Sequence, residues 1–182
     1  MPDVEKDRLF LQAGIQELPD YLLAGELYWP LSANLPRLTV GGLLLAMVRL
    51  RARSASGAEQ AALTVLQQQI QATRTRWRAA WENKAGREMR ARLGLWQNYL
   101  ADYRHSPEQY ADAYPQEVRW RSMLHLLMAE LPASPPEAAA VLQLDSLLKA
   151  CLLPGEFIWE TDLMPAFPRR EYWFLYGKLK AS

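Results

Sequence analysis

Apolar residues recur at intervals of three and four from residue 58 to residue 105, a stretch without proline. This spacing is typical of a helix that buries one face. We therefore predict one very long helix, or two nearly collinear ones, with the other segments packed around it. The positions that define the pattern are Leu63, Leu66, Ile70, Trp77 and Trp81 in the first half and Met89, Leu93, Trp96, Leu100 and Tyr103 in the second.

A polar gap at residues 82–88 separates the two apolar stripes and contains Gly86. At 3.6 residues per turn, the second stripe is rotated by about 100° from the first. Either the helix runs straight and its halves pack against different neighbours, or it kinks near Gly86. We expect the helix to continue through Gly86, because a lone glycine destabilises a helix by only about 1 kcal/mol. A straight helix would be about 70 Å long, so one end would protrude or meet a second copy of the chain.

Shorter helical patterns flank this stretch, and proline, glycine or capping residues separate them. Residues 154–168 hold three prolines and no helical period, so we expect this segment to wrap over the surface. The chain is predicted to be a single all-α domain, 1–182, an antiparallel bundle of six or seven helices built on the long central helix, with short extended tails. The predicted flanking helices are 3–16, 21–28, 40–53 after the capping residue Thr39, 107–110, 115–131, 137–152 and 169–179.

Composition narrows the class of protein. A formal charge of +1 argues against a protein built wholly for nucleic acid. The single cysteine, Cys151, excludes an intrachain disulfide and suits a reducing compartment. The acidic N-terminus does not resemble a signal peptide, and the longest apolar run, 40–48, falls short of the roughly 20 residues that span a bilayer. We expect a cytoplasmic protein that binds no membrane.

Recognisable catalytic motifs are missing from the sequence. The two histidines, His105 and His125, do not lie at a metal-ligand spacing, and no nucleophile elbow, phosphate-binding glycine loop or dinucleotide motif occurs. We therefore predict no metal, no cofactor and no enzymatic activity. The alternative is an enzyme whose carboxylates and histidines meet only in the fold, with a deep polar pocket that encloses Glu26, Glu156 or His125.

A basic stretch surrounds Trp77 and Trp81 on the predicted long helix. Arginine beside aromatic rings can bind nucleic acid through phosphate contacts and base stacking. In the alternative interpretation the arginines form a solvated face, because they spread around the helix and some have a glutamate one turn away, and the tryptophans belong to the core. The candidate anion or nucleic-acid surface consists of Arg74, Arg76, Arg78, Arg87 and Arg90.

Aromatic residues crowd the end of the chain. In the helix predicted at 169–179, Tyr172 and Tyr176 share one face and Phe174 points elsewhere, toward solvent. Exposed aromatic rings are favoured at protein interfaces; the alternative is an aromatic clasp that closes the core. The candidate partner-binding residues are Trp159, Trp173 and Phe174.

These patterns lead to two functional hypotheses. The first is a non-enzymatic interaction or scaffold module that binds a protein partner or associates with itself through the long helix. This hypothesis rests on the missing catalytic motifs and on the length of the predicted helix, which exceeds the width of a compact domain of this size. The alternative is a protein that binds nucleic acid or another polyanion through the basic stretch 74–92.

Overall fold

The computed structural model describes residues 3–32 and 34–181 and is mostly helical, which confirms the helical fold class. By its internal contacts the chain divides into two compact units, Met1–Glu88 and Met89–Ser182. A small two-stranded sheet accompanies the helices of the second unit. The packing of all helices as one bundle around a central helix stays a prediction.

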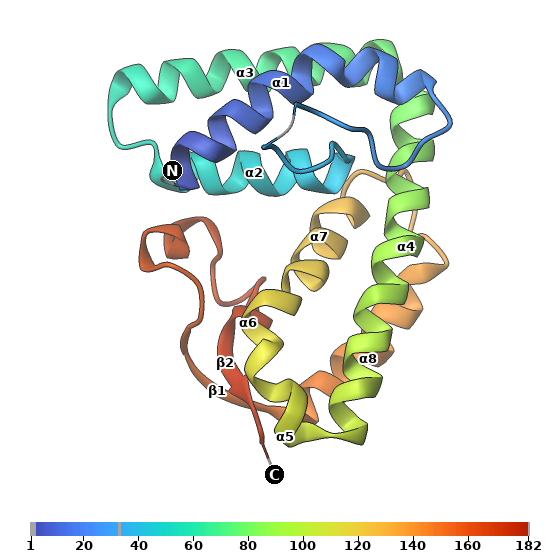
Figure 1. Cartoon of the computed structure of the whole chain (residues 1–182), viewed down its shortest axis with the longest axis vertical. Coiled ribbons are helices and arrows are strands. Elements are labelled where there is room, and N and C mark those ends of the chain that lie inside the picture. Colours follow the sequence, from blue (N-terminus) through green and yellow to red (C-terminus); the bar gives the residue numbers. More distant parts are fainter. Residues whose placement is uncertain (1–2, 33, 182) are drawn as a thin grey trace. The chain divides into compact units, whose positions relative to one another are not determined.

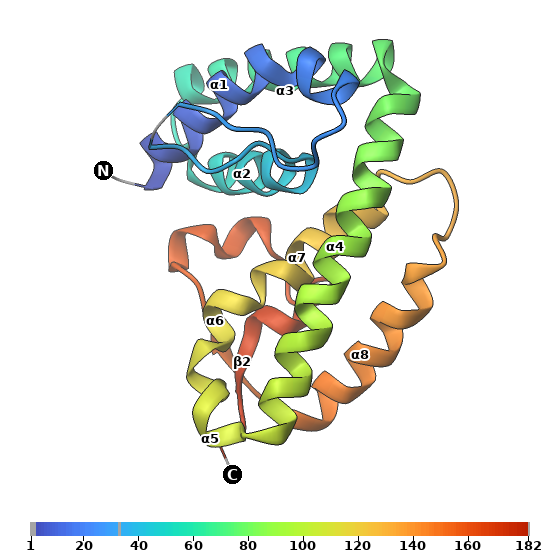
Figure 2. The ribbon, with the colours of Figure 1, turned by 45° about the vertical axis from the view of Figure 1, so that its right-hand side comes forward.

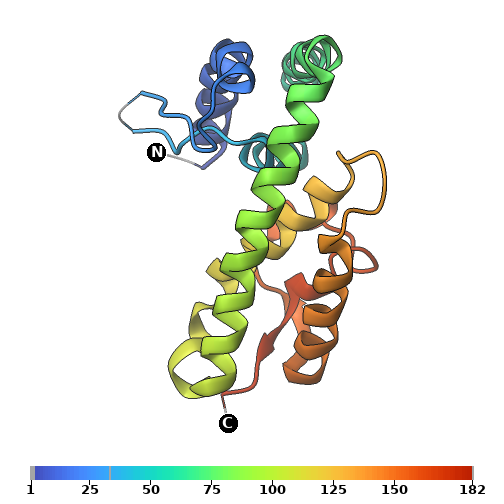
Figure 3. The ribbon, with the colours of Figure 1, turned by 90° about the vertical axis from the view of Figure 1, so that its right-hand side faces the viewer.

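Three helices build most of the first unit: α1 (Asp3–Leu23), α2 (Val40–Arg53) and α3 (Gly57–Arg76). Figure 1 shows α1 and α3 side by side, with α2 packed against both. Figure 3 views the three helices nearly end on, at the corners of a triangle. The apolar side chains that fill the space between them include Leu11, Leu18 and Leu43, none of which is exposed.

Helix α1 is longer than its sequence pattern predicts. It runs through Pro19 to Leu23, so the predicted break after residue 16 and the separate helix 21–28 are wrong. A proline inside a helix costs about 3 kcal/mol. Burial of Leu18, Tyr21 and Leu22, which are at most 4% exposed, offsets this cost.

Helix α4 (Arg78–His105) is continuous through Gly86, which confirms the predicted continuity at that position. The chain instead turns at Trp77, whose φ of −117° and ψ of 40° end α3. Figures 1 and 2 show α3 and the first turns of α4 meeting at a sharp angle, so the prediction of one rod, or of two nearly collinear helices, is wrong. The turn falls within the first apolar stripe, and residues on both sides of it are buried: Leu63 and Ile70 on α3 and Trp81 on α4.

The second unit contains the rest of α4, four further helices and the sheet. Trp96 and Tyr114 are at most 1% exposed, with ring centroids 6.4 Å apart. The helix predicted at 115–131 is interrupted at Val118, and the helix predicted at 137–152 is confirmed. The elements are α5 (Pro107–Tyr110), η1 (Ala111–Ala113), α6 (Tyr114–Glu117), α7 (Arg119–Met128), α8 (Glu137–Cys151), β1 (Leu152–Phe157), η2 (Thr161–Ala166), η3 (Trp173–Leu175) and β2 (Tyr176–Leu179).

The C-terminal segment forms a strand where a helix is predicted. Strand β2 pairs antiparallel with β1, with Leu152 opposite Leu179, so the helix at 169–179 is wrong. Gly177 has a φ of 146°, which a helix does not allow and which favours glycine. The segment 154–168 does more than cover the surface, because it buries Leu163 and Phe167, which are at most 1% exposed.

Gly177 gives a test of this pairing. A Cβ at Gly177 would lie 2.2 Å from the carbonyl oxygen of Leu153, and its φ is strained for any other residue. We expect Gly177→Ala to lower the free energy of unfolding by about 2 kcal/mol, measured by urea denaturation. Gly155→Ala is the matched control, because the nearest atom to a Cβ there is 3.6 Å away. Equal effects of the two substitutions would contradict the observed register.

Among the residues that the structure describes, none of the helices combines the length and the apolar character needed to cross a membrane.

Candidate functional site

The arginines of the predicted anion surface lie on α3 and α4, and several have partners. Arg78 Nε donates to Glu82 at 2.9 Å, and Arg90 lies 3.6 Å from a carboxylate oxygen of Glu137. The Arg76 guanidinium lies 5.4 Å from the ring centroid of Trp77. Arg74 Nη1 donates to the amide oxygen of Gln71 at 3.4 Å, and Arg87 is half-buried.

The three predicted partner-binding aromatics differ in exposure. Phe174 is completely buried, so its predicted exposure is wrong; the Arg121 guanidinium lies 4.5 Å from its ring centroid. Trp159 and Trp173 are half-buried. Trp159 Nε1 donates to the carbonyl oxygen of Pro115 at 2.7 Å, and the Lys149 ammonium lies 4.9 Å from the Trp173 ring centroid.

A buried ion pair lies beside this aromatic cluster. The Arg121 guanidinium donates to both carboxylate oxygens of Asp145, at 2.7 and 2.8 Å, and both residues are at most 6% exposed. His125 is one helical turn from Arg121, and its ring centroid is 4.6 Å from that of Tyr172. Burial, together with the positive charge of Arg121, lowers the pKa of His125 below its usual 6.5. Burial also raises the pKa of Tyr172 to about 12.

The lowered pKa of His125 predicts that acid destabilises the fold. Below pH 6.5 the unfolded chain binds a proton on this imidazole, whereas the folded chain binds it only at lower pH. Stability should therefore fall as the pH drops below 6.5, by at most about 1.4 kcal/mol per pH unit from one proton. Urea unfolding at pH 7.5 and 5.5 measures this difference. His125→Gln should reduce it, and an unchanged pH dependence in that variant would contradict the assignment.

The structure also gives the placement of the residues considered for a metal site or a carboxylate enzyme. The described part of the chain holds no group of three or more histidine, cysteine, aspartate or glutamate side chains placed to bind a metal ion. Glu26 and Glu156, the carboxylates considered for an enzyme, are both exposed.

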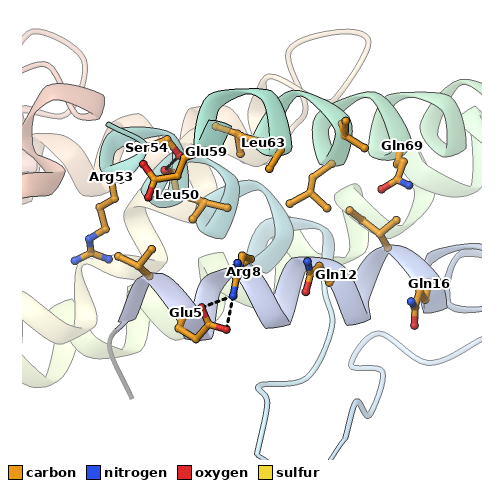
Figure 4. A pocket seen from close by; sticks show the side chains of 15 residues that line it. Glu5, Arg8, Gln12, Gln16, Leu50, Arg53, Ser54, Glu59, Leu63 and Gln69 are labelled. Carbon is orange, nitrogen blue, oxygen red and sulfur yellow. Dashed lines mark hydrogen bonds and ion pairs between the residues drawn. The ribbon is translucent and has the colours of Figure 1, made fainter. Parts of the chain in front are cut away.

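A groove of about 660 Å³ lies between α1 and α3, with the C-terminal end of α2 closing one side (Figure 4). The groove lies within the first unit. Its apolar lining consists of Val4 and Ile15 from α1, Leu50 from α2, and Ala62, Leu63, Val65 and Leu66 from α3. Its polar lining consists of Glu5, Arg8, Gln12, Gln16, Arg53, Ser54, Glu59 and Gln69.

Charged groups at one end of the groove already have partners. Arg8 and Glu5 form an ion pair at 2.6 Å (Figure 4). The Glu59 carboxylate accepts from the backbone N–H of Ser56 at 2.9 Å in a capping box, and hydrogen bonds from Ser56 and Ala55 lower its pKa. Arg53 Nη1 lies 3.9 Å from a carboxylate oxygen of Asp7. The remaining polar lining is neutral and consists of Ser54 and the amides of Gln12, Gln16 and Gln69.

Within the first unit, the described residues leave apolar surface of α3 exposed along this groove. In α3, all of which the structure describes, the buried residues are Leu63 and Ile70. Val65 is 52% exposed and Leu66 is half-buried, and both line the groove. An exposed apolar surface bordered by polar residues is typical of an interaction site.

The groove is not predictable from the apolar stripe of α3 that faces the core. The sequence contains a second, weaker stripe: Ala58, Ala62, Val65 and Ala72 recur at intervals of four, three and seven. On the same helix, glutamines replace the charged residues expected on a solvated face. Together these features indicate a helix with a second contact face.

Comparison with protein-family models, with curated proteins and with solved structures finds no significant match to this chain.

Proposed function

We propose that the protein is a protein-interaction module that binds an amphipathic helix of a partner in the groove between α1 and α3. The observation that carries this proposal is the groove itself, about 660 Å³, with an apolar lining that includes the half-exposed Val65. Small pockets and grooves of this kind, apolar with a few polar groups, are the usual form of a binding site.

The walls of the groove favour a helix as the ligand. The groove is formed by two helices of 21 and 20 residues, each about 30 Å long. A partner helix laid along them would place side chains at positions i, i+3, i+4 and i+7 on the apolar lining. The amides of Gln12, Gln16 and Gln69 would then hydrogen-bond to its flanks. Since these rim groups are neutral, we expect a partner helix with uncharged polar flanks.

A synthetic peptide tests this proposal. The probe is an uncharged 18-residue helix of leucine, alanine and glutamine, fluorescently labelled, with binding followed by anisotropy. We expect Val65→Glu to weaken binding at least tenfold, about 1.4 kcal/mol, because it places a charge on the apolar lining.

Thr64→Glu is the matched control, because Thr64 is exposed on the same helix and does not line the groove. We expect this control to change the affinity by less than about twofold, well under 1 kcal/mol. Circular dichroism of both variants is the control that they fold. Equal loss of binding in both variants, or no binding of the probe to the wild-type protein, would overturn the proposal.

The polyanion hypothesis stays a prediction. Arg78 and Arg90 lie beside carboxylates, and Arg76 lies over an aromatic ring. Binding of generic DNA or RNA at low salt, with a loss of affinity as salt rises, is the measurement that tests it.

A further inference from the structure

The exposed face of α3 is unusual for a helix in contact with solvent. On the side that borders the groove, the residues from position 58 to position 72 carry no charge except Glu59 at the first turn. Ala58, Ala62, Val65, Gln69 and Ala72 are all exposed. A solvated helix face normally carries charged side chains, so this face has the composition of a contact surface, and Val65 lies near its middle.

We propose that the helix bound in the groove is α3 of a second copy of this chain, antiparallel to the first α3, with a two-fold axis beside Val65. This inference rests on the proposed function and names its partner. In such an arrangement each α3 lies in the groove of the other copy. One patch then contacts its own symmetry mate, as a two-fold dimer requires.

The position of Val65 makes the surface self-complementary. Val65 lies near the centre of α3, which spans Gly57–Arg76. A two-fold axis at this residue overlaps the two helices over almost their whole length and places Val65 against Val65 of the second copy. Ala58 then lies opposite Ala72 of the second copy, so small residues meet at both ends and the helices can approach closely. The glutamines of the two rims lie beside one another.

Charge selects the antiparallel direction. The first turn of α3 carries Glu59, whereas its last turn carries Arg74 and Arg76. In the antiparallel arrangement Glu59 lies opposite residue 71 of the second copy, about one turn from Arg74 of that copy. In a parallel arrangement the two glutamates would meet at one end and the arginines at the other, which like-charge repulsion disfavours. The helix dipoles also favour the antiparallel direction.

The size of the contact predicts a weak dimer. A contact in which each copy contributes one 20-residue helix and one groove is expected near the lower limit for stable interfaces, about 1,200 Å² in total. We therefore expect a dissociation constant of about 1–100 µM. Val65→Glu should raise this constant at least tenfold, and Thr64→Glu should leave it within twofold, in sedimentation velocity of the full chain.

Cysteine cross-linking tests the direction of the helices. In a Cys151→Ser background, which removes the cysteine of the natural sequence, Val65→Cys should form a disulfide-linked dimer on mild oxidation. Ala58→Cys alone should not, because the two copies of position 58 would be about 21 Å apart, and a disulfide needs Cα atoms within about 7 Å. An equimolar mixture of the Ala58→Cys and Ala72→Cys chains should cross-link.

The results separate this inference from the function on which it rests. Cross-linking of Ala58→Cys alone, or a chain that stays monomeric up to several hundred micromolar, would overturn the antiparallel dimer. In that case binding of the synthetic helix that is sensitive to Val65→Glu would still support the groove as a helix-binding site. Loss of both would overturn both proposals. The expected cross-links together with a concentration-dependent dimer support the inference.

Discussion

Replacing Asp145 with alanine is expected to lower the free energy of unfolding of the second unit by about 3–5 kcal/mol. Asp145 is 6% exposed and accepts two hydrogen bonds from Arg121, which is 5% exposed. Removal of the carboxylate leaves the guanidinium buried, without its counter-charge and without two acceptors. Urea denaturation followed by tryptophan fluorescence measures the loss.

A double variant separates the loss of a partner from the loss of packing. Arg121→Met with Asp145→Leu removes both charges and keeps apolar volume in their place. We expect the double variant to be more stable than Asp145→Ala. The attraction within a buried ion pair is little larger than the free energy needed to desolvate its two charges. Asp112→Ala, at an exposed aspartate of the same unit, should have little effect. A loss below about 1 kcal/mol for Asp145→Ala would contradict the assigned role of the pair.

The second large effect is expected at Lys84 in the first unit, where Lys84→Ala should cost about 3 kcal/mol. Lys84 is 1% exposed, and its ammonium donates to the carbonyl oxygen of Ala24 at 2.8 Å and to that of Glu26. The ammonium also lies 4.5 Å from the ring centroid of Tyr21. The substitution leaves these carbonyl groups without their donor and opens a cavity beside the C-terminal end of α1.

Burial of the Lys84 ammonium costs desolvation free energy, while its hydrogen bonds stabilise the fold. Burial lowers its pKa, which means that the charged form is less favourable in the folded chain than in water. Lys84→Met keeps the apolar stem and removes the charge, so it should cost less than Lys84→Ala. Lys6→Ala removes an exposed lysine of the same unit and is the control for a general effect of charge. A stability loss at Lys84 no larger than that at Lys6, measured by urea unfolding, would contradict the role of Lys84 as a donor to these carbonyl groups.

The long helical stretch was predictable from sequence, but the position of its interruption was not. Gly86 has the lowest helix propensity of its segment, yet α4 passes through it because only about 1 kcal/mol is at stake. Trp77 is an acceptable helix residue, and yet it ends α3. The difference comes from tertiary packing: the turn lies within the first apolar stripe, and Ile70 before it and Trp81 after it are both buried.

Two charged residues in the polar gap, residues 82–88, are buried although the local sequence pattern gives no sign of it. Lys84 and Glu88 look like solvent-facing residues in the sequence, but both are at most 1% exposed. A carboxylate oxygen of Glu88 accepts from the backbone N–H of Gly41 at 2.8 Å, at the start of α2. Lys84 similarly binds carbonyl groups that follow α1. Partners this far away in the sequence leave no trace in a local hydrophobic pattern.

The C-terminal strand and the groove could not be predicted from the sequence for the same reason: both depend on tertiary contacts. The helical spacing of Tyr172 and Tyr176 is real, but Gly177 and the pairing of β2 with β1 decide the backbone conformation. The groove requires Ile15 of α1 and Val65 of α3 to line one surface. The sequence shows that each helix has apolar residues. Only the fold shows which of these apolar side chains stay exposed.

The most direct test of the helix-binding groove is a nuclear magnetic resonance titration of the ¹⁵N-labelled full chain with an excess of the uncharged synthetic helix. We expect the largest amide shifts on the groove-lining stretches of α1 and α3, residues 4–16 and 59–69. These shifts should disappear in Val65→Glu and persist in Thr64→Glu. Shifts centred on the second unit, or no shifts at saturating peptide, would contradict the helix-binding groove.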